Sequence, residues 1–152
     1  VLRSDCNRGV SGIEGSTSTA AGAACVGEEM TVLITGDMSF SYDVNGLSST
    51  YLSPRFKIIV MCNGGGGIFR FIKPTSDLPE LETCFEIHRD ISVEKYADLF
   101  GLRYFELNDE KSAAEVLSLF FAEKDRPAIL AVHTPNVYNA EVLRGYFRRS
   151  RQ

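Results

Sequence analysis

Three turns in the sequence combine glycines with side chains that can bind a phosphate or a metal ion. The first spans residues 8–17, where a glycine stands at every third position before a stretch rich in Ser and Thr. Glycines let the backbone approach a ligand closely, and the free N–H groups at the start of a helix attract anions. A flexible connection leading into a capped helix has the same pattern, so both interpretations stay open for this segment alone.

The second turn, residues 36–39, places Asp37 directly after an apolar run. A carboxylate in this position can bind Mg²⁺ together with substrate phosphate oxygens. The third turn begins with Asn63 and continues through four glycines to Ile68 and Phe69. The Asn amide oxygen and a glycine carbonyl are also suitable magnesium ligands. An ordinary helix cap at Asp37 and a flexible glycine loop are the alternatives for these two turns.

The common nucleotide-binding motifs do not account for these glycines. No Gly-Lys-Ser or Gly-Lys-Thr follows them, which excludes a Walker A loop. The dinucleotide fingerprint needs G-x-G-x-x-G in the first βα turn and an acidic residue about twenty residues later, and the sequence fits it poorly.

The elements that must position the turns are alternating strands and helices. Strands are predicted over residues 30–35, 56–62 and 128–134, with a weaker candidate over 102–107. Helices are predicted over 16–25, opened by a Ser/Thr cap, over 92–100 and over 111–124, and a long loop with a short helix over 70–90. We therefore predict an α/β fold, a doubly wound parallel sheet with helices on both faces, as a single domain over residues 1–152. Ligands bind such sheets beyond the carboxyl ends of the strands, where the second and third turns begin.

Composition excludes several classes of function. Sixteen basic and twenty acidic residues give a net charge of −4, without the basic face of a nucleic-acid-binding protein. No apolar run approaches the roughly 20 residues of a membrane helix, so no integral membrane segment is expected. The four cysteines are widely spaced and lack a CxxC pair, which favours reduced thiols in a cytoplasmic protein over a zinc site. His88 is interpreted as a surface residue, and His133 as a satisfied histidine at a strand end.

Together the second and third turns have the pattern of thiamine-diphosphate enzymes, in which Gly-Asp-x is followed at a characteristic interval by Asn. The wider pattern is Asn7-Arg8-Gly9-x-Ser11-Gly12-Ile13-x-Gly15, Ser18-Thr19-Ala20, Gly36-Asp37-x-Ser39, Asp43-x-Asn45-Gly46-Leu47 and Gly65-Gly66-Gly67-Ile68-Phe69. It closely resembles the 2-succinyl-5-enolpyruvyl-6-hydroxy-3-cyclohexene-1-carboxylate synthase family of menaquinone biosynthesis. The resemblance runs from Asn7 to Phe69 and is looser beyond.

The resemblance implies roles for particular residues. Asp37, the Asn63 side chain and the Gly65 carbonyl would hold Mg²⁺ against the diphosphate of thiamine diphosphate. The cofactor site would be completed by Gly12, Ile13, Gly36, Met38, Ser39 and Gly66, with Ile13 as the bulky residue beneath the thiazolium. Arg8 would face a substrate carboxylate, and Ile68 and Phe69 would line the substrate pocket. The sequence departs from the superfamily at Cys62, which replaces the first of two adjacent asparagines.

The resemblance also implies an activity and an assembly. The chain, which begins without an initiator Met, looks like the C-terminal fragment of a three-domain, homo-oligomeric enzyme that decarboxylates 2-oxoglutarate and adds the product to isochorismate. The activating Glu of this family lies in the N-terminal domain. No catalytic residue is therefore expected in this chain, and the 152 residues alone should turn over no substrate. The alternatives are another thiamine-diphosphate enzyme, an acetolactate synthase or a 2-oxoacid decarboxylase, and a non-catalytic nucleotide- or phosphate-binding module.

Overall fold

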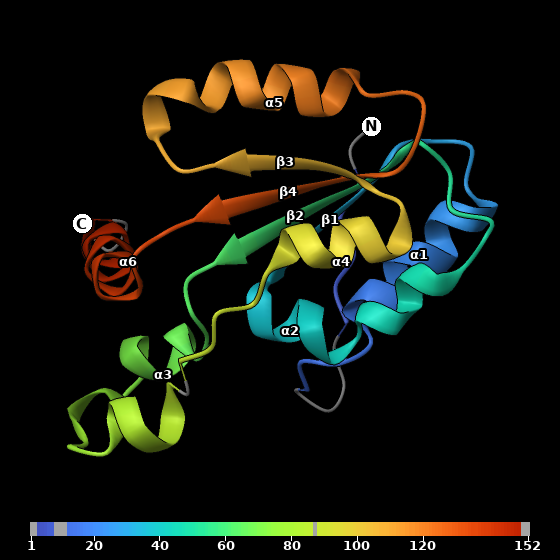
Figure 1. The fold of residues 1–152 in the computed structure, drawn as a ribbon. Coiled ribbons are helices and arrows are strands. Elements are labelled where there is room, and N and C mark those ends of the chain that lie inside the picture. The colour runs from blue at the N-terminus through green and yellow to red at the C-terminus, as the bar shows by residue number, and fades with distance from the viewer. Residues whose placement is uncertain (1–2, 8–11, 87, 150–152) are drawn as a thin grey trace.

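The computed structural model describes residues 3–7, 12–86 and 88–149. Within these residues four strands form one parallel sheet in the order β1-β2-β4-β3 (Figure 1). The strands are β1 (Thr31–Gly36), β2 (Phe56–Cys62), β3 (Arg103–Leu107) and β4 (Ala128–His133). All four predicted strands are confirmed, and only their ends differ, by one residue.

The helices of the described residues vary widely in length. They are α1 (Ser16–Val26), α2 (Asp37–Tyr42), α3 (Gly67–Phe71), α4 (Val93–Phe100), α5 (Ala113–Ala122) and α6 (Asn136–Arg149). Short 3₁₀ turns lie at η1 (Val44–Ser48), η2 (Thr75–Asp77) and η4 (Glu110–Ser112), and η3 (Leu81–Phe85) is a single π-helical turn. The described part of residues 70–90, the stretch predicted as a long loop with a short helix, contains the end of α3 followed by η2 and η3. No described helix combines the length and the apolar character needed to cross a membrane.

The strand order explains why helices cover both faces of the sheet. From β1 through β2 to β3 the chain moves across the sheet in one direction, so right-handed connections place α2 and α4 on the same face. The return from β3 to β4 reverses that direction and places α5 on the opposite face, as Figure 1 shows. The predicted doubly wound arrangement is confirmed.

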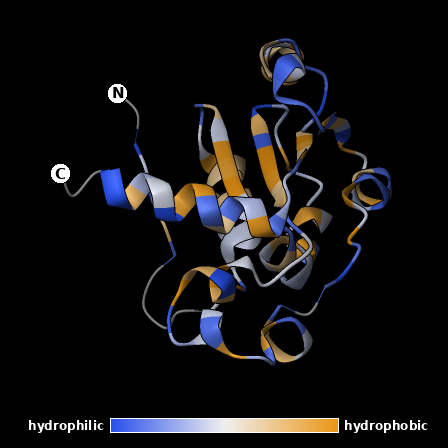
Figure 2. Ribbon diagram, turned by 90° about the vertical axis from the view of Figure 1, so that its left-hand side faces the viewer, coloured by the Kyte–Doolittle hydropathy of each residue, from blue (hydrophilic) through white to orange (hydrophobic). Residues whose placement is uncertain are grey.

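Each face has its own hydrophobic core. One core joins α1, α2 and α4 to β2 through fully buried Phe40, Phe56 and Ile58. The other packs Phe120 of α5 against Leu130 of β4. The two central strands are mostly apolar because they are covered on both sides, and the buried Lys57 of β2 donates to the Glu123 carbonyl at 2.7 Å. Figure 2 shows strands of hydrophobic residues at the centre of the ribbon.

The Ser/Thr cap predicted for α1 is wrong. The residue before the helix is Gly15, at φ 83°, and no side chain next to it caps the helix. Instead the Asp43 carboxylate accepts hydrogen bonds from the backbone N–H of Ser18 at 2.7 Å and from the Ser18 hydroxyl at 2.5 Å. A carboxylate near a helix start is favoured by the unpaired N–H groups there. This contact fixes α1 against the segment that follows α2.

Candidate functional site

Strand register brings the second and third turns together at one edge of the sheet. Gly36 pairs with Met61 across β1 and β2, so Asp37 and Asn63 both lie just beyond the paired residues. Asp37 is buried, with 4% of its surface exposed. One of its carboxylate oxygens accepts hydrogen bonds from the backbone N–H groups of Asn63 at 3.0 Å and Gly64 at 2.8 Å. The buried carboxylate therefore joins two turns that are separate in the sequence.

The glycine loop has a backbone that side-chain-bearing residues rarely adopt. Gly64, Gly65 and Gly66 have φ angles of 84°, 96° and 59°. A Cβ added at Gly66 would lie 2.5 Å from the backbone Cα of Glu86. Within the loop, the amide oxygen of Asn63 accepts a hydrogen bond from the N–H of Gly65 at 3.0 Å. The loop is thus a folded turn, and its glycines are required by conformation and by close packing.

The donor set at this edge fits a hard cation. Asp37 offers a carboxylate, Asn63 an amide oxygen and Gly65 a carbonyl. The Asp37 oxygen that accepts the Met38 N–H, the Asn63 amide oxygen and the Gly65 carbonyl each have one hydrogen bond here and so keep a lone pair. Among the described residues no group of three or more His, Cys, Asp or Glu could hold a metal ion. A metal at this edge would therefore rest on mixed oxygen donors, the kind of ligand that suits Mg²⁺.

The first turn reaches the same region. The Ser39 hydroxyl at the start of α2 donates a hydrogen bond to the backbone carbonyl of Ile13, which holds residues 12–13 beside the 37–39 turn. The Ile13 side chain remains 44% exposed. Met38 donates its backbone N–H to Asp37 at 2.7 Å. The predicted substrate residue Arg8 lies outside the described residues.

The other two predicted substrate residues, Ile68 and Phe69, lie on α3. Neither lines the large cavity, of about 1000 Å³, that is described below. Phe69 packs on Phe85, with ring centroids 5.5 Å apart. Ile68 is 58% exposed and borders a small cavity of about 220 Å³ between α3 and α6. The structure therefore joins Asp37 to the start of the glycine loop, at Asn63 and Gly64, and neither Gly65 nor Ile68 nor Phe69 lines the large cavity.

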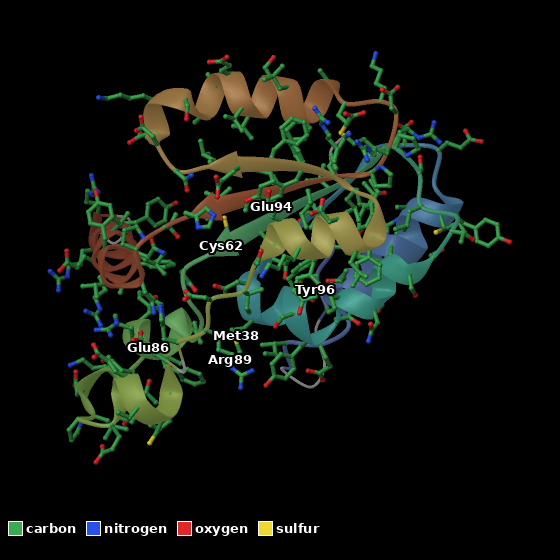
Figure 3. The ribbon with its side chains drawn as sticks, viewed as in Figure 1. Met38, Cys62, Glu86, Arg89, Glu94 and Tyr96 are labelled. Carbon is green, nitrogen blue, oxygen red and sulfur yellow. The ribbon has the colours of Figure 1, made fainter. Side chains whose placement is uncertain are left out.

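The large cavity, of about 1000 Å³, opens at the carboxyl ends of the strands. Its walls include Asp37, Asn63 and Gly64, together with Glu86 and Asn136. Figure 3 shows Cys62, Met38 and Glu86 on this side of the sheet, with Glu86 toward α3 and α6. Asp37 and Asn63 thus border a space large enough for a small organic ligand.

Cys62 lies half-buried at the wall of this cavity. Burial raises the pKa of its thiol to about 11, and the nearby negative charges of Asp37 and Glu106 act in the same direction. The thiol therefore stays protonated at neutral pH and is a poor nucleophile.

Both histidines match their sequence interpretation. The His133 Nε2 lies 3.1 Å from a carboxylate oxygen of Glu106, so this strand-end histidine has a partner while it borders the cavity. His88 has a side chain that is 78% exposed, and its Nε2 lies 3.9 Å from Asp90.

Sequence reasoning missed a buried polar network behind the glycine loop. Glu86 is paired with Arg70, and its hydrogen bonds raise the pKa of the Arg70 guanidinium. The Asn136 amide donates to Glu86 at 3.0 Å and to the Gly65 carbonyl at 3.3 Å. Asn136 follows β4 closely, so the rule that pointed to Asp37 and Asn63 could also have found it. No comparable sequence signal marks Glu86 or Arg70.

Comparisons with a family model and with individual proteins point to the same group of enzymes. Residues 3–132 match the family described as "Thiamine pyrophosphate enzyme, C-terminal TPP binding domain". A protein of Porphyromonas gingivalis is 50% identical over 93% of this chain, one of Flavobacterium johnsoniae 44% over 94%, and one of Christiangramia forsetii 40% over 96%. All three are named 2-succinyl-5-enolpyruvyl-6-hydroxy-3-cyclohexene-1-carboxylate synthase. The matched regions are 24%, 26% and 25% of these relatives, so the chain spans about a quarter of their length.

Proposed function

The chain belongs to the C-terminal TPP-binding domains of thiamine pyrophosphate enzymes, and from this premise we propose that it is the diphosphate-binding domain of a 2-succinyl-5-enolpyruvyl-6-hydroxy-3-cyclohexene-1-carboxylate synthase. The names of its relatives favour this activity over an acetolactate synthase or a 2-oxoacid decarboxylase. The substrates would be 2-oxoglutarate and isochorismate. The full-length enzyme would have three domains, act as a homo-oligomer in the cytoplasm, and carry its activating Glu outside this chain.

One observation carries the metal-binding part of the proposal. The buried Asp37 carboxylate accepts hydrogen bonds from the backbone N–H groups of Asn63 and Gly64, which supports a shared site between the two turns that carry the proposed oxygen donors. Asp37, Asn63 and Gly65 would hold Mg²⁺, which would screen the charge of the diphosphate. Backbone groups of Gly12, Gly36, Met38, Ser39 and Gly66 would surround the phosphates.

The remaining assignments concern the reacting end of the cofactor. The chemistry that thiamine diphosphate supplies when bound is a carbon nucleophile for the decarboxylation of a 2-oxo acid. Ile13 would support the ring of the cofactor, and its exposed side chain is free to do so. Arg8 would bind a substrate carboxylate, and Ile68 and Phe69 would border the substrate. Because the activating Glu is assigned to another domain, this chain alone is expected to show no synthase activity.

Titration of thiamine diphosphate into the full-length protein tests the metal site. The parent protein should bind the cofactor only with Mg²⁺, and Asp37→Ala should weaken that binding more than about a hundredfold, because loss of even an outer-shell partner typically costs 10–100-fold. Asp37→Asn keeps an acceptor for the Asn63 and Gly64 N–H groups but removes the negative charge. It should also bind the cofactor weakly, and this result would show that the charge, and not only the folding of the loop, is needed.

Glu123→Ala is the matched control, since the Glu123 carboxylate also accepts a backbone N–H, from Asp125 at 2.7 Å, but Glu123 precedes β4 and so lies at the opposite edge of the sheet. Cofactor binding should be unchanged in this variant. Unaltered Mg²⁺-dependent binding by Asp37→Ala would refute the metal assignment. Equally tight binding of ADP by the parent protein would favour a general phosphate-binding module instead.

A further inference from the structure

Asn136, the first residue of α6, contacts the glycine loop at a residue other than the two that Asp37 holds. Its amide N–H₂ group donates to the Gly65 carbonyl at 3.3 Å, across 71 residues of sequence. Its amide oxygen lies so close to Gly67 that a Cβ there would be 2.5 Å away, and the Asn63 amide would be 2.6 Å from the same Cβ. Asn136 therefore contacts the loop that carries both Asn63 and Gly65.

The orientation of Asn136 is fixed by a buried ion pair. The same N–H₂ group that bonds Gly65 also donates to Glu86 at 3.0 Å. The side chain of Glu86 is only 7% exposed and is held by Arg70, whose Nε lies 2.8 Å from the shared carboxylate oxygen. Arg70 has a second carboxylate partner in Glu82, at 2.8 Å. A carboxylate held in this way can accept from the Asn136 amide in only a narrow range of orientations.

We propose that Asn136, held by Glu86 and Arg70, is a positioning residue that orients the Gly65 carbonyl for a divalent cation. The inference rests on the proposed function, because it takes Gly65 as a metal ligand. A carbonyl oxygen has two lone pairs, so it can accept from Asn136 and still face a cation with the other. Gly65 adopts φ 96°, and a loop of four glycines has many competing conformations. The hydrogen bond selects one direction for its carbonyl before the cation arrives.

Mg²⁺ titration of the full-length protein at saturating thiamine diphosphate tests this role. Asn136→Leu removes the donor while keeping a similar volume, and it should raise the Mg²⁺ dissociation constant about tenfold, the lower end of the range for outer-shell partners. Asn136→Gln keeps an amide and should recover part of the affinity. Asn139→Leu is the control: Asn139 lies one turn along α6, is similarly half-buried and donates to Thr134 at 2.8 Å. It should leave the Mg²⁺ affinity unchanged.

The outcomes separate the inference from the function on which it rests. A parent protein without Mg²⁺-dependent cofactor binding would refute both. A parent that binds normally, together with an unchanged Mg²⁺ dissociation constant in Asn136→Leu, would refute only the role of Asn136. An equal loss in Asn139→Leu would also refute it, because the effect would then come from α6 in general.

If Asn136→Leu does not fold, as judged by circular dichroism, Glu86→Gln becomes the deciding variant. That variant keeps an acceptor for Asn136 but weakens the Arg70 pair, and it should weaken Mg²⁺ binding by a smaller factor; an unchanged affinity there would refute the proposal.

Discussion

The glycine loop allows a paired test of how its packing contributes to stability. Gly66 and Gly101 both adopt left-handed backbone angles, φ 59° and φ 70°. Their surroundings differ. A Cβ at Gly66 would lie 2.5 Å from the Glu86 Cα and 2.7 Å from the Phe85 carbonyl oxygen, whereas nothing lies within 4 Å of a Cβ at Gly101. Both neighbours of Gly66 are backbone atoms, which cannot move aside as the end of a flexible side chain can.

Alanine at each position separates the two effects. Gly101→Ala should lower the free energy of unfolding by about 1–2 kcal/mol, the general cost of a left-handed L-residue. Gly66→Ala has the same cost plus a steric conflict worth about 1–3 kcal/mol, so its total loss should be about 2–5 kcal/mol. The chain must relieve the conflict by moving the loop away from the segment around Glu86.

Urea unfolding of the 152-residue chain, followed by far-UV circular dichroism, measures the difference between the two variants. Amide hydrogen exchange provides a local measurement, because the N–H of Arg89 donates to the Gly64 carbonyl at 3.1 Å and should exchange faster only in Gly66→Ala. Equal destabilisation by both substitutions, with unchanged exchange at Arg89, would refute the steric reasoning.

Two further predictions concern the cavity wall and the second core. Cys62 should react with iodoacetamide about a hundredfold more slowly below pH 9 in the folded protein than in urea, because raising its pKa from 9.0 to about 11 lowers the thiolate fraction by that factor. The rate of labelling in the folded protein should rise as the pH approaches 11. Timed labelling with peptide mass spectrometry measures the rates with and without urea. Equal rates at pH 8 would contradict the raised pKa. Phe120→Ala should lower the free energy of unfolding by about 3–5 kcal/mol. Phe120 is fully buried, and its ring centroid lies 5.7 Å from that of Phe105. Phe121→Ala, at a residue 38% exposed, should cost clearly less in the same urea experiment, and similar losses would argue against the assigned core.

The fold was largely predictable because its signals are local. Strands at the centre of a parallel sheet are covered on both faces and therefore contain continuous apolar runs, as residues 58–62 do. The helix at residues 92–100 carries both of its end signals in the sequence: Ser92 accepts the N–H of Lys95, and Gly101 ends the helix at φ 70°. The contact at the start of α1 could not be predicted, because Asp43 lies 25 residues from Ser18 and only the tertiary structure brings the two together.

The sequence by itself determined which turns carry oxygen donors of the kind that suits a metal ion, since residue type and position after a strand are local properties. Asp37, Asn63 and the glycines could be chosen on that basis. Only the tertiary structure decided which of them meet: the pairing of Gly36 with Met61 sets Asp37 against Asn63 and Gly64. It also placed Asn136 and Glu86 behind the loop, and turned Phe69 toward Phe85. Contacts between residues far apart in the chain depend on strand register and on the path of each connection, and no local pattern encodes either.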